Sequence, residues 1–149
     1  MDSRAETLKH SQRVGELMGE VIIELVKRSQ KHDRSKTESP EVEIFDEYTE
    51  KLKDLTYGSP EYTASLEAMG DAITHHYEHN RHHPEHYIEG IDGMTLVDLI
   101  EMLADWKAAT ERVKDGSLSE SLKIQKARFG MTDQLYNILE NTAEDKVWI

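Results

Sequence analysis

The chain has 149 residues, the usual size of one domain, and we expect residues 1–149 to form a single domain. Its formal net charge of −12 argues against non-specific nucleic-acid binding, and the absence of cysteine excludes a disulfide scaffold, a zinc–thiolate site and a cysteine nucleophile. No apolar run approaches the roughly 20 residues of a membrane span, and the N-terminus has no signal-peptide core, so we expect a cytoplasmic protein, a phage-infected host included.

The first predicted element is a long amphipathic helix. Ser3 and Glu6 have the spacing of a capping box at its start. Apolar residues then recur at steps of three and four until the helix ends near Gln30. They are Leu8, Val14, Leu17, Met18, Val21, Ile22, Leu25 and Val26.

Two Ser-Pro pairs predict the next two helices. After a loop, Ser39 and Pro40 are placed to act as N-cap and first residue of a second helix, which Gly58 would close. Ser59 and Pro60 repeat this start signal for a third helix. Its apolar stripe is Tyr62, Leu66, Met69, Ile73 and Tyr77.

The third helix should end near Arg81, because Pro84 disfavours helical geometry at the residue before it. Thr95 and Asp98 then form a capping box for a long fourth helix that stops at Gly116. We see no strand of convincing alternation, so the predicted fold class is all-α. Shorter helices are expected over 118–128 and 132–141.

Histidine is concentrated in one stretch, HHYEHNRHHPEH, which spans residues 75–86 and holds six of the eight histidines. A solvated surface patch, a pH switch and a metal site are all compatible with this composition. Because the third helix carries its stripe through Ile73 to Tyr77, His76 should face inward or lie at the edge of the stripe. We favour a metal and phosphate role.

Three further positions, on or beside different helices, could carry chemistry. His10 lies on the inward face of the first helix, although alone it reads as a core histidine. His32-Asp33 follows that helix, and imidazole with carboxylate suits Mn, Fe, Co, Ni or Zn, although such a pair is common by chance. Asp105 lies beside the apolar stripe of the fourth helix, where a carboxylate needs a partner such as a metal or Arg112.

This ordered set resembles the HD-domain superfamily of metal-dependent phosphohydrolases. HSQRV at 10–14 resembles the first-histidine helix of that superfamily, HDRSK its His-Asp turn and LADWKAATER its last metal-binding helix. The resemblance implies a compact HD-like helical bundle that binds one or two divalent ions. The implied ligands are His10, His32, Asp33 and Asp105.

In HD branches with two metals, extra histidines between the His-Asp pair and the last Asp bind a second ion. The histidine stretch resembles that element, which implies ligands from the set His75, His76, His82 and His83. The Asp-Gly and Gly-Tyr-Pro that follow the element in those branches are missing here, which argues against specificity for cyclic dinucleotides.

The function implied is hydrolysis of a nucleotide or another small phosphate ester. Asp33, Lys36 and Glu38 are the candidate catalytic residues, and Arg34, Lys36 and Arg81 are candidates to bind phosphate. Glu38, or in its place Glu41, could orient the water, although each reads more simply as a helix-start acid.

Two alternatives stay open: an HD-like di-iron oxygenase, and a non-catalytic accessory protein that binds a nucleotide or a host partner. We expect a small phosphorylated substrate as partner, no nucleic acid and no membrane, and leave a homodimer open. Over most of its length the chain also resembles a family of bacteria and phages known as a domain of unknown function. That resemblance is carried by HDRSK, YGSPEY, NRHHPEHY, GIDGMTLVDLIEMLADW and RFG.

Overall fold

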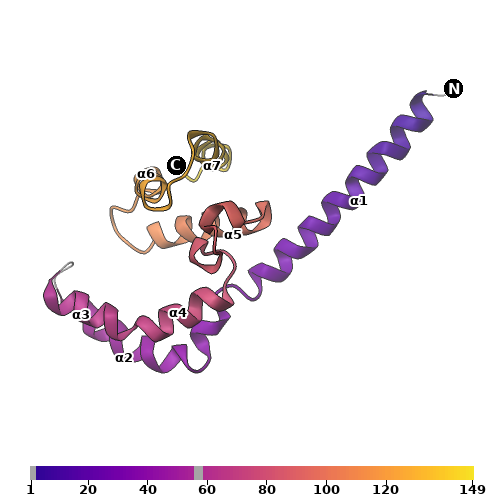
Figure 1. Ribbon diagram of the computed structural model, residues 1–149. Helices are drawn as coiled ribbons and strands as arrows, with labels where there is room; N and C mark the ends of the chain where they lie inside the picture. Colours follow the sequence, from indigo (N-terminus) through magenta and orange to yellow (C-terminus); the bar gives the residue numbers. More distant parts are fainter. Residues whose placement is uncertain (1–2, 56–58) are drawn as a thin grey trace. The chain divides into compact units, whose positions relative to one another are not determined.

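The computed structural model describes residues 3–55 and 59–149, and every regular element in them is helical (Figure 1). The predicted all-α class is therefore confirmed. The α-helices are α1 (Ser3–Ser29), α2 (Glu41–Lys53), α3 (Pro60–Ala68), α4 (Gly70–His79), α5 (Leu96–Thr110), α6 (Leu118–Phe129) and α7 (Asp133–Asp145). Three short 3₁₀ helices are η1 (Arg34–Thr37), η2 (Pro84–His86) and η3 (Gly90–Gly93).

Contacts along the chain divide it into two units, residues 1–32 and residues 33–149. The first unit is the single helix α1, which has no buried residue. The second unit contains all the other helices. The expectation that the whole chain makes one domain stays a prediction. None of the described helices is long and apolar enough to cross a membrane.

Helix starts follow the predicted caps in most places. Ser59 caps α3 by accepting from the backbone N–H of Tyr62, and Thr95 forms the predicted capping box with Asp98. The start of α2 was predicted one residue too early. The helix begins at Glu41 and its N-cap is Pro40. Ser39, the predicted N-cap, does not cap the helix.

The predicted third helix is divided in two, which corrects the sequence-based boundary. Met69 separates α3 from α4, and Gly70, a residue of low helix propensity, begins α4. α4 then ends at His79, two residues before the predicted Arg81. Gly58, the predicted end of the second helix, lies outside the described residues.

The main hydrophobic core lies among α5, α6 and α7 of the second unit. Met102, Leu103, Leu118, Leu122, Met131, Leu139 and Ala143 form it. α5 ends at Thr110, earlier than the predicted Gly116. A Cβ on Gly116 would lie only 1.8 Å from the Thr110 carbonyl oxygen, so the turn that leaves α5 requires glycine there.

The second unit also places the chemistry-bearing residues. α2 packs against η1, α3 and α4, and η2 contacts α4 and η3. The turn at Asp33, the end of α4, the histidine loop and α5 are thereby held within one unit.

Candidate metal centre

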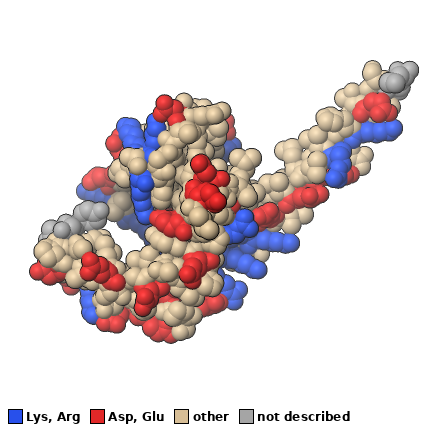
Figure 2. Space-filling view, in the orientation of Figure 1, with Lys and Arg blue, Asp and Glu red and all other residues tan. Residues whose placement is uncertain are grey.

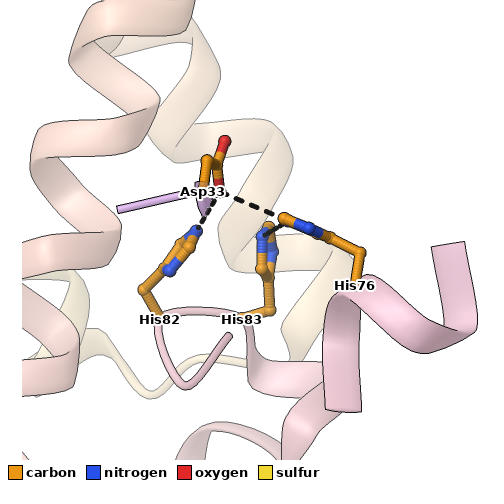
Figure 3. Close-up of side chains that lie close together, drawn as sticks. All are labelled: Asp33, His76, His82 and His83. Atoms are coloured by element: carbon orange, nitrogen blue, oxygen red, sulfur yellow. Dashed lines mark hydrogen bonds and ion pairs between the residues drawn. The ribbon is translucent and has the colours of Figure 1, made fainter. Parts of the chain in front are cut away.

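Four side chains of the second unit point toward one another: Asp33, His76, His82 and His83 (Figure 3). One ligand atom from each lies within 4.8 Å of the others. Asp33 precedes η1, His76 lies on α4, and the two remaining histidines come from the loop between α4 and η2. The cluster thus joins segments that are 43 to 50 positions apart in the chain.

Asp33 reaches the cluster through an unusual backbone conformation. Its φ of 54° and ψ of 18° are left-handed, a region that Asp tolerates better than most residues. This gives the sharp turn that a ligating His-Asp pair requires. Burial opposes ionisation of this carboxyl, but hydrogen bonds from His76, His82 and Lys36 outweigh it and hold the Asp33 pKa well below its usual range. The side chain is therefore a carboxylate.

His76 is buried, as its place on the apolar stripe predicted, and a second carboxylate fixes its ring. Its Nδ1 lies 3.0 Å from Oε2 of Glu41, the fully buried first residue of α2. Asn80 also lies near this nitrogen, but its amide N–H groups have better acceptors, the His76 carbonyl and Ser35 Oγ, both at 2.8 Å. We therefore assign the Nδ1 proton to the bond with Glu41, which turns Nε2 toward the cluster.

Glu41 is ionised in this setting. Burial raises its pKa, but hydrogen bonds from His75, Ser35 and His76 outweigh burial and lower it. His75 Nδ1 lies 2.6 Å from Glu41 Oε1. Because His75 faces Glu41 and stacks on His79, it lies beside the cluster as a partner of the carboxylate, and the structure does not bring it among the four converging side chains.

His82 repeats the arrangement of His76 with a different helix. Its Nδ1 lies 3.3 Å from Oε1 of Glu101 on α5, and its Nε2 lies 3.4 Å from Asp33 Oδ1. Asp105, one turn further along α5, approaches the same Nε2 at 3.8 Å. The ring is almost fully buried. Two histidines on different segments are thus each oriented by a glutamate and aim Nε2 at the same carboxylate.

His83 completes the group from the turn that Pro84 was predicted to impose. Its backbone is extended (φ −98°, ψ 127°), and its Nε2 lies 2.9 Å from His76 Nε2. Burial and the neighbouring His82 and His76 lower the pKa of His83 to about 3, so its ring is neutral. A neutral imidazole is the form that binds metal.

Three of the separations within the cluster have the lengths expected between ligands of a single ion. Atoms about 2.1 Å from one ion lie about 3.0 Å apart at right angles and about 3.4 Å apart in a tetrahedron. His76 Nε2 lies 2.9 Å from His83 Nε2 and 3.3 Å from Asp33 Oδ1. His82 Nε2 lies 3.4 Å from the same Asp33 oxygen. The lone pairs of these nitrogens and the carboxylate oxygen repel one another unless a cation or shared protons lie between them.

Among the other charged residues of the predicted site, Lys36 contacts the cluster, whereas Arg34 and Glu38 contact each other. Lys36 forms an ion pair with Asp33 at 2.7 Å from Nζ to Oδ2 and is partly exposed. Arg34 and Glu38 are both exposed and pair with each other at 2.9 Å. Lys36 thus lies beside the cluster, whereas Arg34 and Glu38 form an exposed pair on the surface.

Arg81 is engaged elsewhere. Its Nε donates to the Tyr87 hydroxyl at 3.1 Å and lies 3.4 Å from the buried carboxylate of Asp98. These contacts tie the loop after α4 to the start of α5, and a structural role accounts for them. Phosphate binding by Arg81 stays a prediction.

His10 and His32 belong to the first unit. His10 lies on α1, which has no neighbour within its own unit, so the expectation that His10 faces inward stays a prediction. His32 is the last residue of that unit and is joined directly to Asp33. Their predicted roles as metal ligands stay predictions.

Sequence reasoning undervalued the two glutamates that orient the histidines. From the sequence, Glu41 is interpreted as a helix-start acid or as a group that orients water, and Glu101 has no assigned role. Glu41 is the first residue of a helix, where acids are common, so position alone conceals its role. A signal for Glu101 existed, since it lies four residues before Asp105 and therefore on the same face of α5.

Comparison of the sequence with models of known protein families identifies the family of this chain. The model of a family of unknown function (DUF5662) matches residues 1–145. The chain belongs to this family. No curated protein and no solved structure matches it. Membership of DUF5662 agrees with the resemblance to a domain of unknown function and brings no activity with it.

Proposed function

We propose that this DUF5662 member binds one divalent transition-metal ion through Asp33, His76, His82 and His83, and that it is a metal-dependent phosphohydrolase. The observation that carries the proposal is the pair of glutamate-oriented histidines, which aim Nε2 at the same ionised Asp33. A carboxylate or carbonyl that fixes the far nitrogen of a ligating histidine is a recurrent feature of metal sites. Three imidazoles and one carboxylate favour Zn, Fe, Co or Mn over Ca or Mg.

The margin of the cluster supports hydrolysis of a phosphate ester. An ion held here supplies Lewis acidity toward a phosphoryl oxygen and makes water a better nucleophile near neutral pH. Lys36 is close enough to add a positive charge for phosphate, and Asp105 is placed to accept a proton near His82. The HD resemblance of HDRSK and LADWKAATER supports the same reaction class, with a ligand set shifted toward the histidine loop.

Metal analysis of protein purified without a histidine tag tests the binding step. We expect about one ion per chain in wild type and loss of that ion in His83→Ala. His79→Ala is the matched control, because His79 is exposed and its Nδ1 bonds to the His75 carbonyl. His10→Ala separates the two ligand sets: retention supports the cluster proposed here, and loss would favour the set implied by the HD signature.

Hydrolysis is tested with nucleoside mono-, di- and triphosphates and cyclic nucleotides, in the presence of Mn, Co or Fe(II). We expect turnover of at least one of them by metal-loaded wild type, and a higher KM in Lys36→Ala because ground-state phosphate binding is lost. Stoichiometric metal with no turnover of any substrate would refute the hydrolase and leave a metal-binding accessory protein. Oxygen uptake with substrate would instead identify an oxygenase.

A further inference from the structure

The neutral His76 ring can bind an ion through Nε2 only when its single proton is on Nδ1, because a protonated ring nitrogen has no lone pair to offer. The surroundings of Nδ1 therefore decide whether His76 is a ligand. Three polar side chains approach this nitrogen: Glu41 at 3.0 Å, Asn80 at 3.1 Å and Ser35 at 3.3 Å. Glu41 accepts the proton, and the other two side chains have a different effect.

Asn80 is the neighbour that could favour the wrong tautomer. Its side-chain amide is buried and lies 2.8 Å from the His76 carbonyl oxygen, which can only accept a hydrogen bond. The Asn80 atom at this position is therefore the amide nitrogen, and it presents donors to His76 Nδ1 as well. A hydrogen bond donated to Nδ1 would stabilise the tautomer that carries its proton on Nε2.

Ser35 gives the second amide proton of Asn80 another acceptor. The amide nitrogen has two protons, of which one bonds to the His76 carbonyl and the other to Ser35 Oγ, 2.8 Å away. Neither proton is then left for His76 Nδ1. Ser35 lies on η1, two residues after Asp33, so the turn that presents the Asp33 carboxylate also brings this hydroxyl to Asn80.

The hydroxyl proton of Ser35 is directed to Glu41. Acidic side chains are spread over the visible face of the second unit, where water can hydrogen-bond to them (Figure 2). Glu41 is instead fully buried, and His75, Ser35 and His76 hydrogen-bond to it. Its carboxylate holds the proton on His76 Nδ1. Ser35 thus acts on both neighbours of that nitrogen, since it supports the acceptor Glu41 and occupies the donor Asn80.

We propose that Ser35 is a positioning residue of the metal centre, which keeps the His76 Nε2 lone pair free by holding the Asn80 amide proton away from Nδ1. The inference rests on the proposed metal binding and adds the residue that selects the tautomer. Without the hydroxyl, the freed Asn80 proton can bond to His76 Nδ1. The ring stays neutral with its proton on Nε2, where it donates to Asp33 Oδ1, 3.3 Å away, and excludes the ion.

Zinc affinity in two single variants and their double variant tests the proposal, with a chromophoric chelator as competitor. We expect Ser35→Ala to lower zinc affinity about 10- to 100-fold, the range typical of groups that orient a metal ligand. Asn80→Ala should stay close to wild type, because Glu41 still holds the Nδ1 proton. In the double variant most of the loss should be recovered, since the competing donor is gone. An equal loss with and without Asn80 would overturn the proposal.

Two further variants separate the role of the Ser35 hydroxyl from a general effect on η1. Thr37→Ala removes an exposed hydroxyl of the same 3₁₀ helix, which bonds to the Arg34 carbonyl at 2.8 Å, and should leave zinc affinity unchanged. Ser35→Thr retains the hydroxyl and should retain most of the affinity. A loss in Thr37→Ala as large as that in Ser35→Ala would assign the effect to η1 as a whole and contradict the proposal.

Nitrogen NMR of the metal-free, isotope-labelled protein reads the tautomer without any dependence on metal binding, because protonated and bare ring nitrogens differ widely in chemical shift. At a pH where the His76 ring is neutral, we expect its proton on Nδ1 in wild type and on Nε2 in Ser35→Ala. A proton on Nε2 in wild type, or on Nδ1 in both proteins, would overturn the inference. The expected pair of tautomers in a protein that binds no metal would support the tautomer selection and refute the proposed function.

Discussion

The side chain of Glu41 is fully buried, and its two carboxylate oxygens bond to His75 and His76. It is ionised and bonded to His75 and His76, so its loss should disturb the orientation of His76 more than the fold around it. We predict that Glu41→Gln lowers metal affinity about 10- to 100-fold, because an amide orients the imidazole less strongly than a carboxylate. Competition with a chromophoric chelator measures this change.

Glu43→Gln is the control for that change. Glu43 lies in the same first turn of α2 but is exposed, so the substitution alters the helix dipole interaction and leaves His76 untouched. Metal affinity equal to wild type is expected. An equal loss in both variants would assign the effect of Glu41 to charge at the helix start.

Asp98 is, like Glu41, a fully buried acidic residue, and it forms the capping box at the start of α5. Its Oδ2 accepts from the Thr95 backbone N–H and hydroxyl, both at 2.8 Å, and from the Tyr87 hydroxyl at 2.7 Å. We predict that Asp98→Ala lowers the free energy of unfolding by about 2–4 kcal/mol, since it removes the α5 capping box and leaves buried donors unpaired. Urea denaturation measures the loss. Asp92→Ala, at an exposed position nearby, should change it by less than about 0.5 kcal/mol.

At the scale of the helices, α6 packs one face against the hydrophobic core and leaves another face exposed to solvent. Leu122 is fully buried among α5 and α7, and Ile124, two residues later, is 66 % exposed. We predict that Leu122→Ala costs about 2–5 kcal/mol of unfolding free energy through the cavity it leaves. Ile124→Ala should cost less than about 1 kcal/mol. Similar costs in thermal or urea denaturation would contradict this division of faces.

Capping residues and apolar periodicity in the sequence predicted most helices. They failed where a helix boundary depends on a contact with a residue far away in the chain. Ser59 and Thr95 cap their helices because a cap requires only neighbouring backbone. Ser39 does not cap α2, and the carboxylate that begins that helix bonds instead to α4, 34 and 35 positions away. No local pattern records such a contact. The division at Met69 was also missed, because the apolar stripe continues across it.

The same limit applies to the site. The stripe through Tyr77 placed His76 on the inner face, and Pro84 predicted the turn that presents His83. Which residues meet Asp33 depends on how α4 packs against η1 and on the path of the loop that carries His82, and periodicity predicts neither. The HD signature therefore pointed to Asp33 and Asp105 as acids near one cluster, but it did not identify His82 as the histidine that both approach.

For the whole molecule, the proposed ion should act on stability through mass action. Zn or Co at about 100 times its Kd should stabilise the native state by about 2.7 kcal/mol and raise Tm by about 8 °C. Calcium, which prefers oxygen ligands, should produce no comparable shift. Thermal unfolding of wild type and His76→Ala with each metal measures this. A zinc-induced rise that survives in His76→Ala would locate the stabilising ion elsewhere.

The turn at Asp33 and the far end of α4 enclose a loop of more than forty residues that contains α2 and α3. An ion shared by Asp33 and His76 would close that loop in the folded chain, which has no cysteine with which to form a disulfide. Because its ligands converge only on folding, the ion would hold the loop closed through its binding free energy and would leave the unfolded chain unconstrained. The ion would then serve as a reversible cross-link, removable by a chelator rather than by a reductant, and the order of α2 and α3 would depend on metal supply.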